Sequence, residues 1–420
     1  MNQAFYTGIG GLQTHQYGID IITHNIANMN TPGFRGSQVE FSSFFENVVN
    51  SASASGPTEN SIGVGAQVQA TPMIQTGGVL MSTDITTNLA LEGDGWFGIS
   101  NPQGTFYTRA GDFSFDGSRN LVNTAGYFVL GTMGSNISNG VLTQELESTP
   151  LGAIGTQQPL MMPDELIYPV EPTTQAQFFG NLGIDPIQRL GSASLISAVG
   201  EHNRLELRFD MSATQPVSGT AWDITATVTS SDGSIVYDTQ SGSATFDEFG
   251  AIIGYTMPNV NNDGTSVAVD LGTGFAGLIA NSGDTAGELS SSSNGYEGGE
   301  LVGYDISTNA DVIATFTNGR QSAIGKVGVF HFQNDQGLER VSGTLFRESP
   351  NSGQPIFYTD ADGNPMLGAI TRNAMVENSN VRIEVGLTEL IVMQRAYDAN
   401  SKSITTGDEL IQKALQMDAR

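Results

Sequence analysis

The C-terminal stretch, residues 377–420, carries the pattern that most restricts how this chain can fold. Apolar or aromatic side chains recur there every seven residues, with further apolar residues three or four positions on. This spacing puts an apolar stripe along one side of a helix and is typical of a helix that packs against another long helix. The seven-residue series consists of Ile383, Leu390, Tyr397, Ile404 and Ile411.

The other end of the chain offers a partner for this helix. Residues 3–28 are predicted to be helical and to stop at residues 28–33, where asparagine, proline and glycine break a helix. The matching series there is Phe5, Leu12, Ile19 and Ile26. A coiled coil between the two ends of one chain, or between ends of neighbouring copies, satisfies both stripes. The alternative is that each helix docks separately on its own globular domain.

The N-terminal helix is unusually rich in glycine. Gly8, Gly10, Gly11 and Gly18 lie within it, and each lowers the stability of an isolated helix by about 0.8–1 kcal/mol relative to alanine. In the C-terminal segment Asn400 and Gly407 have a similar weakening effect. Such helices are expected to form through packing rather than by intrinsic propensity.

Composition limits the classes of function. The chain has 420 residues and a net charge of −27, which argues against nucleic acid as a partner because phosphates would be repelled. The same charge opposes binding to anionic membranes, and no run of eighteen apolar residues is present to insert into a bilayer. The N-terminus lacks the basic and apolar regions of a Sec-type signal peptide. The absence of cysteine excludes disulfides and thiolate chemistry.

The middle of the chain is expected to be β-rich. Alternating apolar residues over 205–211 and 222–228 predict half-buried strands, and Asp116-Gly117 predicts a hairpin. The predicted fold class is therefore α+β and multidomain, with a coiled-coil domain of terminal helices and two nested all-β domains of sandwich or barrel type. The expected parts are a helical domain of residues 1–30 and 378–420, a connecting segment 31–75, a discontinuous inner β domain 76–149 and 295–377, and an inserted outer β domain 150–294.

No motif in the sequence supports catalysis or a cofactor. Residues 93–98 match G-x-G-x-x-G, but another predicted strand follows where a dinucleotide site needs a helix, so a tight turn is favoured. Residues 360–364 resemble part of a calcium loop, yet the glycine and glutamate spacing of that loop fails, so a turn is again favoured. We therefore expect no catalytic residue, no cofactor and no metal.

Motifs at both ends carry a resemblance to a known family. Residues 25–35, Asn-Ile-Ala-Asn-Met-Asn-Thr-Pro-Gly-Phe-Arg, closely resemble the N-terminal signature of bacterial flagellar rod and hook proteins. Residues 377–381, followed by Gln394-Arg395-Ala-Tyr-Asp-Ala-Asn400, look like the C-terminal signature of the same family. Residues 89–97 and 107–113 match its first β domain. Arg382 and Asn88 depart from the family pattern, which usually has aspartate at both positions.

The resemblance implies a structural role. The length of the chain and its 150–294 insertion are closer to the hook members than to the shorter rod members. The family's implied assembly is a helical polymer of many copies, a curved extracellular tube that transmits torque as a universal joint. Its implied partners are the distal rod protein, the hook cap and the hook–filament junction proteins, with export that needs no cleaved signal peptide. The residues expected at the assembly interface are Phe5, Leu12, Ile19, Asn25, Ile26, Asn28, Ile383, Leu390, Gln394, Arg395, Tyr397, Ile404 and Ile411.

Two other functions remain open at this stage. A distal rod subunit of the same family shares the terminal motifs. A secreted β-rich binding protein or adhesin would also suit the acidic middle region, which is rich in serine, threonine and glycine.

Overall fold

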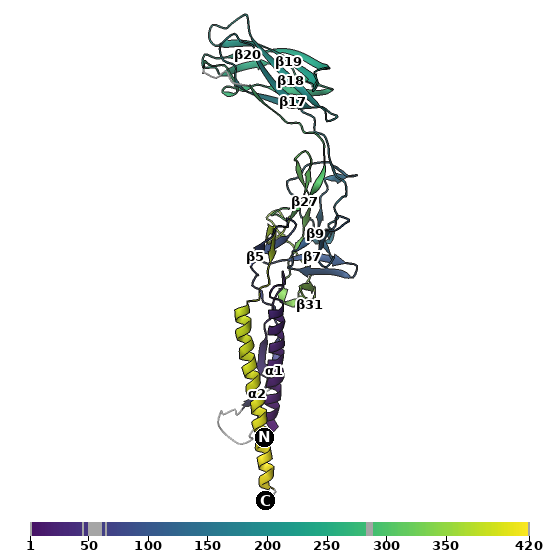
Figure 1. Cartoon of the computed structure of the whole chain (residues 1–420), viewed down its shortest axis with the longest axis vertical. Helices are drawn as coiled ribbons and strands as arrows, with labels where there is room; N and C mark the ends of the chain where they lie inside the picture. The colour runs from purple at the N-terminus through teal and green to yellow at the C-terminus, as the bar shows by residue number, and fades with distance from the viewer. Residues whose placement is uncertain (1, 44–45, 49–60, 64, 283–288, 419–420) are drawn as a thin grey trace.

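The chain folds into an elongated molecule that is mostly β-structure, with one long helix at each end of the sequence (Figure 1). The computed structural model describes residues 2–43, 46–48, 61–63, 65–282 and 289–418. Both termini lie at the same end of the molecule, and the sheets follow one another towards the other end. This arrangement agrees with the predicted combination of terminal helices and β-rich middle.

The two predicted terminal helices are present with nearly the predicted limits. Helix α1 spans Asn2–Ala27 and helix α2 spans Ile383–Asp418. Helix α1 ends in a turn in which the Asn28 amide donates to the His24 carbonyl, and Pro32 then prevents any continuation. Glu384 lies in the first turn of α2, where a negative charge interacts favourably with the helix dipole.

The segment predicted only as a connection contains paired strands. Strand β1 (Glu40–Ser43) pairs antiparallel with β4 (Ala66–Ala70), and β2 (Glu46–Val48) pairs with β3 (Ser61–Gly63). Strand β4 packs on α1, where the Thr14 hydroxyl donates to the Ala66 carbonyl at 2.7 Å. The hairpin therefore forms an additional layer on the helices. Residues 44–45 and 49–60 of this segment lie outside the described residues.

The inner β region is one 15-stranded sheet built from two distant parts of the chain. Strand β11 pairs with both β7 and β29, which joins the earlier part of the chain to the later part in one sheet. The Asp116-Gly117 hairpin is confirmed, because β9 and β10 pair antiparallel across it. The strands of the sheet are β7 (Trp96–Asn101), β8 (Gly104–Thr108), β9 (Phe113–Phe115), β10 (Leu121–Asn123), β11 (Phe128–Met133), β12 (Ile137–Ser138), β13 (Val141–Leu142), β14 (Gln158–Pro159), β15 (Ile167–Tyr168), β27 (Gly299–Ile306), β28 (Asp311–Phe316), β29 (Gln321–Val327), β30 (Val329–Phe330), β31 (Glu339–Ser342) and β32 (Leu345–Arg347).

Short two-stranded sheets connect this region to the ends of the chain. Strand β5 (Leu80–Ser82) pairs with β36 (Met375–Glu377), and β6 (Leu89–Glu92) pairs with β35 (Ile370–Asn373). Residues 93–95 form the turn between β6 and β7, and Gly93 and Gly95 have positive φ angles. The G-x-G-x-x-G match is thus a strand-to-strand turn. Residues 360–364 are likewise a turn, between β33 (Tyr358–Thr359) and β34 (Pro365–Met366).

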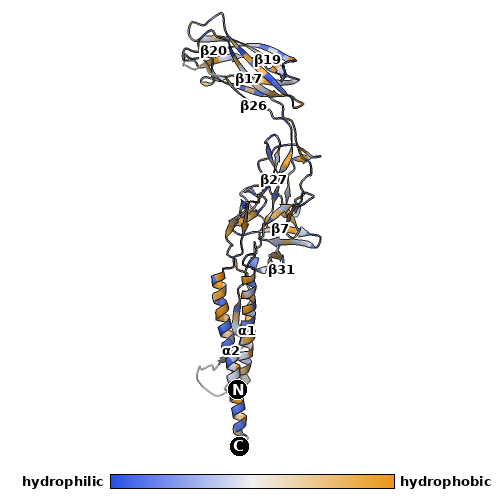
Figure 2. Cartoon of the chain, in the orientation of Figure 1, coloured by the Kyte–Doolittle hydropathy of each residue, from blue (hydrophilic) through white to orange (hydrophobic). Residues whose placement is uncertain are grey.

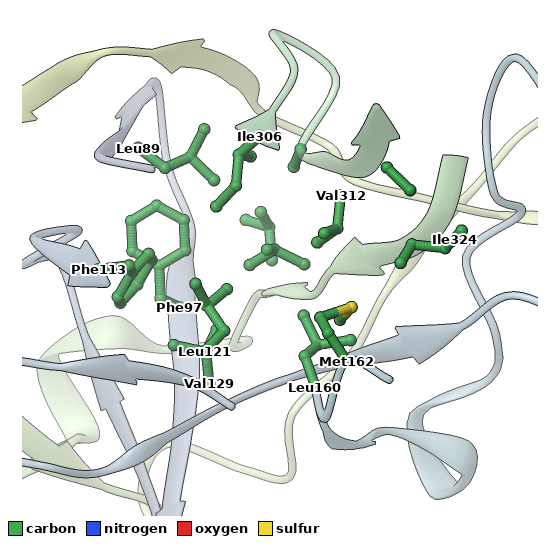
Figure 3. Packing of buried hydrophobic residues seen from close by; sticks show 14 of the residues in the cluster. Leu89, Phe97, Phe113, Leu121, Val129, Leu160, Met162, Ile306, Val312 and Ile324 are labelled. Carbon is green, nitrogen blue, oxygen red and sulfur yellow. The ribbon is translucent and has the colours of Figure 1, made fainter. Parts of the chain in front are cut away.

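The core of the inner region draws side chains from both parts of the chain. Phe97 and Phe113 contact edge to face with ring centroids 5.0 Å apart, and Val312 and Ile324 from the later strands are fully buried in the same cluster (Figure 3). Burying large apolar side chains of this kind is the main favourable term in folding. Neither part of the chain could form this core alone.

The far end of the molecule holds two further sheets around a separate core. The predicted alternation at 205–211 and 222–228 is confirmed, with Leu205, Leu207 and Phe209 buried between exposed neighbours. The six-stranded sheet contains β16 (Gln175–Asn181), β22 (Val260–Asn262), β23 (Thr265–Asp270), β24 (Gly272–Thr273), β25 (Ala276–Ile279) and β26 (Ser290–Ser293). The five-stranded sheet contains β17 (Arg189–Ile196), β18 (His202–Met211), β19 (Thr220–Ser230), β20 (Val236–Phe246) and β21 (Ile252–Thr256).

Because the two buried clusters share no residue, they are expected to unfold separately. Phe209→Ala should destabilise the outer sheets by about 3–5 kcal/mol through the cavity it leaves. Phe97→Ala should do the same to the inner sheet only. Differential scanning calorimetry checks this: each substitution should lower one of two transitions. A single transition lowered equally by both substitutions would contradict it.

Candidate assembly site

Helices α1 and α2 lie side by side and run in opposite directions (Figure 1). Gly8 faces Ile404, Gly11 faces Asn400 and Gly18 faces Met393, so positions rise along one helix as they fall along the other. Near the other end of the pair, Gly386 of α2 faces Ile26 of α1. The partner that the C-terminal stripe requires is thus available within the same chain.

Glycines on α1 allow the two helices to approach closely. A Cβ atom built at Gly8 would lie 2.8 Å from Cγ1 of Ile404, and one at Gly11 would lie 2.8 Å from the side chain of Asn400. Asn400, which is a weak helix former, fits against the space that Gly11 leaves. The glycines that lower the helix propensity of α1 therefore provide its contact surface with α2. Sequence reasoning identified their cost but not this role.

The predicted stripe of α2 largely faces inward. Leu390, Tyr397, Ile404 and Ile411 are all partly buried, whereas Ile383 is exposed. Gln394 and Arg395 are also exposed. Of this series, Ile404 is the residue that lies against a glycine of α1.

On α1 the face towards α2 lies beside the predicted stripe. Gly8, Gly11 and Gly18 make the close contacts, while Leu12 and Ile19 are only partly buried and Phe5 is exposed. Ile26 does contact α2, through Gly386. A pattern of large apolar residues could not locate this face, because its central positions carry no side chain.

Both helices keep large apolar side chains exposed. Figure 2 shows hydrophobic residues along both of them. Tyr6 and Tyr17 of α1 are more than half exposed, as are Ile391 and Val392 of α2. The C-terminal end of α2 also extends beyond the start of α1 (Figure 1). Exposed apolar surface along two packed helices favours a protein interaction site. Further exposed apolar residues of α2 are Val385, Leu387, Leu410, Leu415 and Met417.

A groove of about 580 Å³ runs between α1 and strand β4. It exposes the rings of Tyr6 and Tyr17 together with Ile9, and none of its lining residues carries a charge. The groove therefore offers an uncharged surface beside α1.

The asparagines of the two signatures hold the base of the helix pair together. The Asn25 side chain donates to the Ser37 carbonyl at 2.7 Å and accepts from the Ser37 amide at 3.1 Å. Asn380 accepts from the Gly36 amide and donates to the Ile74 carbonyl, both at 2.8 Å. Asn28 donates to the His24 carbonyl of its own helix. Asn25 and Asn28 thus make these contacts within the subunit.

A buried ion cluster lies beside these asparagines. The Glu377 carboxylate contacts Arg35 at 3.0 Å and Arg109 at 2.8 Å, and all three side chains are almost fully buried. Each residue belongs to one of the quoted family motifs, but sequence reasoning gave none of them a role. No spacing rule could have joined them, because they are far apart in the chain.

Comparisons with known proteins agree with these features. Residues 5–35 match the model of the flagella basal body rod protein family, and residues 90–155 match the flagellar hook protein FlgE/F/G D1 domain. Residues 372–417 match the C-terminal model of the flagellar basal body rod FlgEFG proteins. The three matches cover most of both helices and the earlier part of the inner sheet.

The chain is similar to flagellar hook proteins along nearly its whole length. The flagellar hook protein FlgE of Borreliella burgdorferi is 29% identical, over 99% of this chain and 100% of that protein. The FlgE of Escherichia coli K12 is 24% identical, over 97% of this chain and 98% of that protein. The crystal structure of Helicobacter pylori hook protein FlgE2 has a TM-score of 0.52 at 15% identity, covering 71% of this chain and 100% of that one, and supports the fold.

Two further observations concern other kinds of site in this chain. Within the described part of the chain, no group of three or more His, Cys, Asp or Glu side chains could hold a metal ion. None of the helices described is long and apolar enough to span a membrane.

The glycine contact surface leads to a direct test. Gly8→Val should destabilise the helix pair by about 1–3 kcal/mol, because its side chain would overlap Ile404. Gly407→Ala is the matched control: a Cβ there meets nothing within 4 Å, so alanine should instead stabilise α2 by about 0.8–1 kcal/mol. Thermal unfolding followed by far-UV circular dichroism measures both. Stabilisation by both substitutions would show that the close approach is not required.

Proposed function

We propose that copies of this chain polymerise through the outer surfaces of α1 and α2 into the curved tube of the flagellar hook, outside the cell. The observation that carries this proposal is the apolar surface left exposed along both helices after they have packed together. A chain that carries only 14% charged residues, against about 25% in typical domains, can bury much of its surface without removing many charges from water.

The exposed faces favour an open assembly. The outer face of α1 presents tyrosines, whereas that of α2 presents aliphatic residues, so the two surfaces differ. Contacts between different surfaces on successive copies generate a helical polymer when the rotation does not close into a ring. The predicted interface positions that remain exposed, Phe5, Ile383, Gln394 and Arg395, are available for these contacts.

Within each subunit we propose an antiparallel coiled coil of α1 and α2. Its inner positions would include Ile404, Asn400 and Met393, which face the glycines of α1. The partly buried Leu390, Tyr397 and Ile411 would complete them. Residues 76–149 with 295–377, and residues 150–294, would be the nested inner and outer β domains. The sheet pairing of β11 with β29 and the two separate cores support this division. The helices would form the inner layer of the tube, and the β domains would lie outside.

The outer domain has a surface suited to contacts that shift at small cost. On strands β19 and β20, Thr225 lies opposite Ser241 and Thr227 opposite Thr239. On β19 the two threonines alternate with buried residues, and on β20 Thr239 and Ser241 are exposed, so these hydroxyl groups lie on the solvent side of the sheet. Short neutral side chains exchange hydrogen bonds with water and with a neighbour at similar energy. A curved, rotating tube needs such contacts, because its subunits must change spacing once per turn.

The remaining partners follow from membership of the hook. The subunit would contact the distal rod protein at one end of the tube, and the hook–filament junction proteins and the cap at the other. Its export would require no cleaved signal peptide. Neither alternative, a distal rod subunit or a secreted adhesin, is favoured by the comparisons, since relatives named as hook proteins align over nearly their whole length.

The outer surface of α2 can be tested directly. Ile391→Asp should abolish polymerisation while leaving the monomer folded, because Ile391 is 52% exposed and a carboxylate cannot be buried cheaply at an apolar interface. Electron microscopy of the purified protein at high concentration should show curved tubes for the parent chain and none for the variant.

A matched control adds the same charge elsewhere on the helix. Thr406→Asp places a carboxylate at an exposed polar position of α2 and should still allow tubes to form. A parent chain that stays monomeric at high concentration would contradict the proposed function. Tubes formed by the Ile391→Asp variant would contradict the assignment of this surface.

A further inference from the structure

The helix pair joins the β-structure at a single crowded junction. Arg35 lies a few residues after α1 ends, and Glu377 lies a few residues before α2 begins. The main chains meet there as well: the Gly33 amide donates to the Glu377 carbonyl at 2.7 Å, and the Asn380 amide donates to the Phe34 carbonyl at 3.3 Å. Both connections between the helices and the inner sheet therefore pass through this point.

The Glu377 carboxylate is the group that both arginines share. One oxygen accepts from the Gly78 amide at 2.7 Å and contacts Arg35, while the other accepts from Nε of Arg109. The side chain of Glu377 is 1% exposed. Every other ion pair between described side chains has a partner that is at least 12% exposed, so this cluster is distinct in its burial.

Each arginine is also fixed to the β-structure on its own side. Arg109 donates to the Gly95 carbonyl at 2.7 Å and to the Gly93 carbonyl at 2.8 Å, which holds it against the turn between β6 and β7. Arg35 donates to the Thr76 carbonyl. Burial lowers the pKa of the Arg35 guanidinium, and the Glu377 carboxylate opposes that shift. The carboxylate therefore connects two guanidinium groups whose other hydrogen bonds are already taken.

Close backbone contacts make this junction stiff. A Cβ atom at Gly78 would lie 1.8 Å from the Asn378 carbonyl oxygen, and one at Gly33, whose φ is +67°, would lie 2.2 Å from the Ala110 nitrogen. Arg340 adds a contact from strand β31, donating to the Arg35 carbonyl while its guanidinium lies 5.1 Å from the ring centre of Phe34. A flexible connection would not bring backbone atoms so close.

We infer that Glu377 is a positioning residue that fixes the direction of the helix pair relative to the inner sheet. This inference rests on the proposed function, because the direction of the helices decides how each copy presents its outer helix surfaces to the next. The two oxygens of this one carboxylate hold Arg35, which follows α1, and Arg109, which directly follows strand β8 of the sheet. A purely stabilising role would leave the direction unchanged in every folded molecule.

The test measures how well the direction of the helix pair is fixed relative to the inner sheet in the monomer. Because the chain has no cysteine, labels can be placed at will: Tyr17→Cys on α1 and Val302→Cys on β27 are both well exposed. Double electron–electron resonance between the two spin labels should give a narrow distance distribution for the chain that carries no further substitution. Glu377→Gln should make the distribution about twofold wider, because the amide leaves two buried guanidinium groups without a counter-charge.

Two further variants keep the result decisive. Glu92→Gln is the matched control, since Glu92 pairs with Arg372 in an exposed ion pair of the same β region and should leave the distribution unchanged. Glu377→Asp keeps the charge but is too short to reach both arginines, so it should also widen the distribution. If Glu377→Gln fails to fold, as shown by loss of the far-UV circular dichroism signal, Glu377→Asp tests whether Glu377 fixes the direction of the helix pair.

The outcomes separate this inference from the proposed function. A broad distribution in the parent chain would overturn the inference. So would an unchanged distribution in a folded Glu377 variant, even if its melting temperature falls. Failure of the parent chain to polymerise would contradict the proposed function alone, because the spin-label measurement is made on monomers.

Discussion

The close packing of the two ends of the chain against each other is the constraint on which the remaining structure depends. Because α1 and α2 lie side by side, the chain between them must begin and end where the helix pair meets the sheets. The sheets satisfy this by pairing early strands with late ones, as β5 pairs with β36 and β11 with β29. Contacts of such high sequence separation bury a core that no shorter piece of the chain could form.

Apolar side chains are buried in the β region but partly exposed along the helices, and this difference supports the proposed function. The two β cores are closed, with side chains such as Phe97 and Phe209 inaccessible to water. The helix pair is only two helices and a hairpin thick, so it cannot cover its own apolar residues. Ile391 and Tyr17 stay exposed for that geometric reason. The β region buries its own apolar cores, whereas the helices leave apolar side chains exposed, as the proposed polymerisation requires.

Several features were predictable because they depend on local periodicity. The seven-residue series predicted helix α2, alternation predicted the strands around Phe209, and the Asp116-Gly117 turn predicted a hairpin. The face of α1 was missed, since contact there is made by glycines, which have no hydrophobic signal. The hairpin of β1 and β4 was also missed, because its strands are short and largely exposed, so neither alternation nor an apolar run distinguishes them.

The sequence by itself determined the element types, the charge-poor and acidic character of the surface, and the family signatures at both ends. These depend on residues near one another in the chain. The tertiary structure alone decided which atoms meet at the junction, where Glu377 contacts Arg35 and Arg109. Those three residues are hundreds of positions apart or lie in separate elements, and only the folded path of the chain brings their charges together. The tertiary structure also decided the role of the α1 glycines. They lower the helix propensity of α1 but form its contact surface with α2, and close approach depends on both helices together.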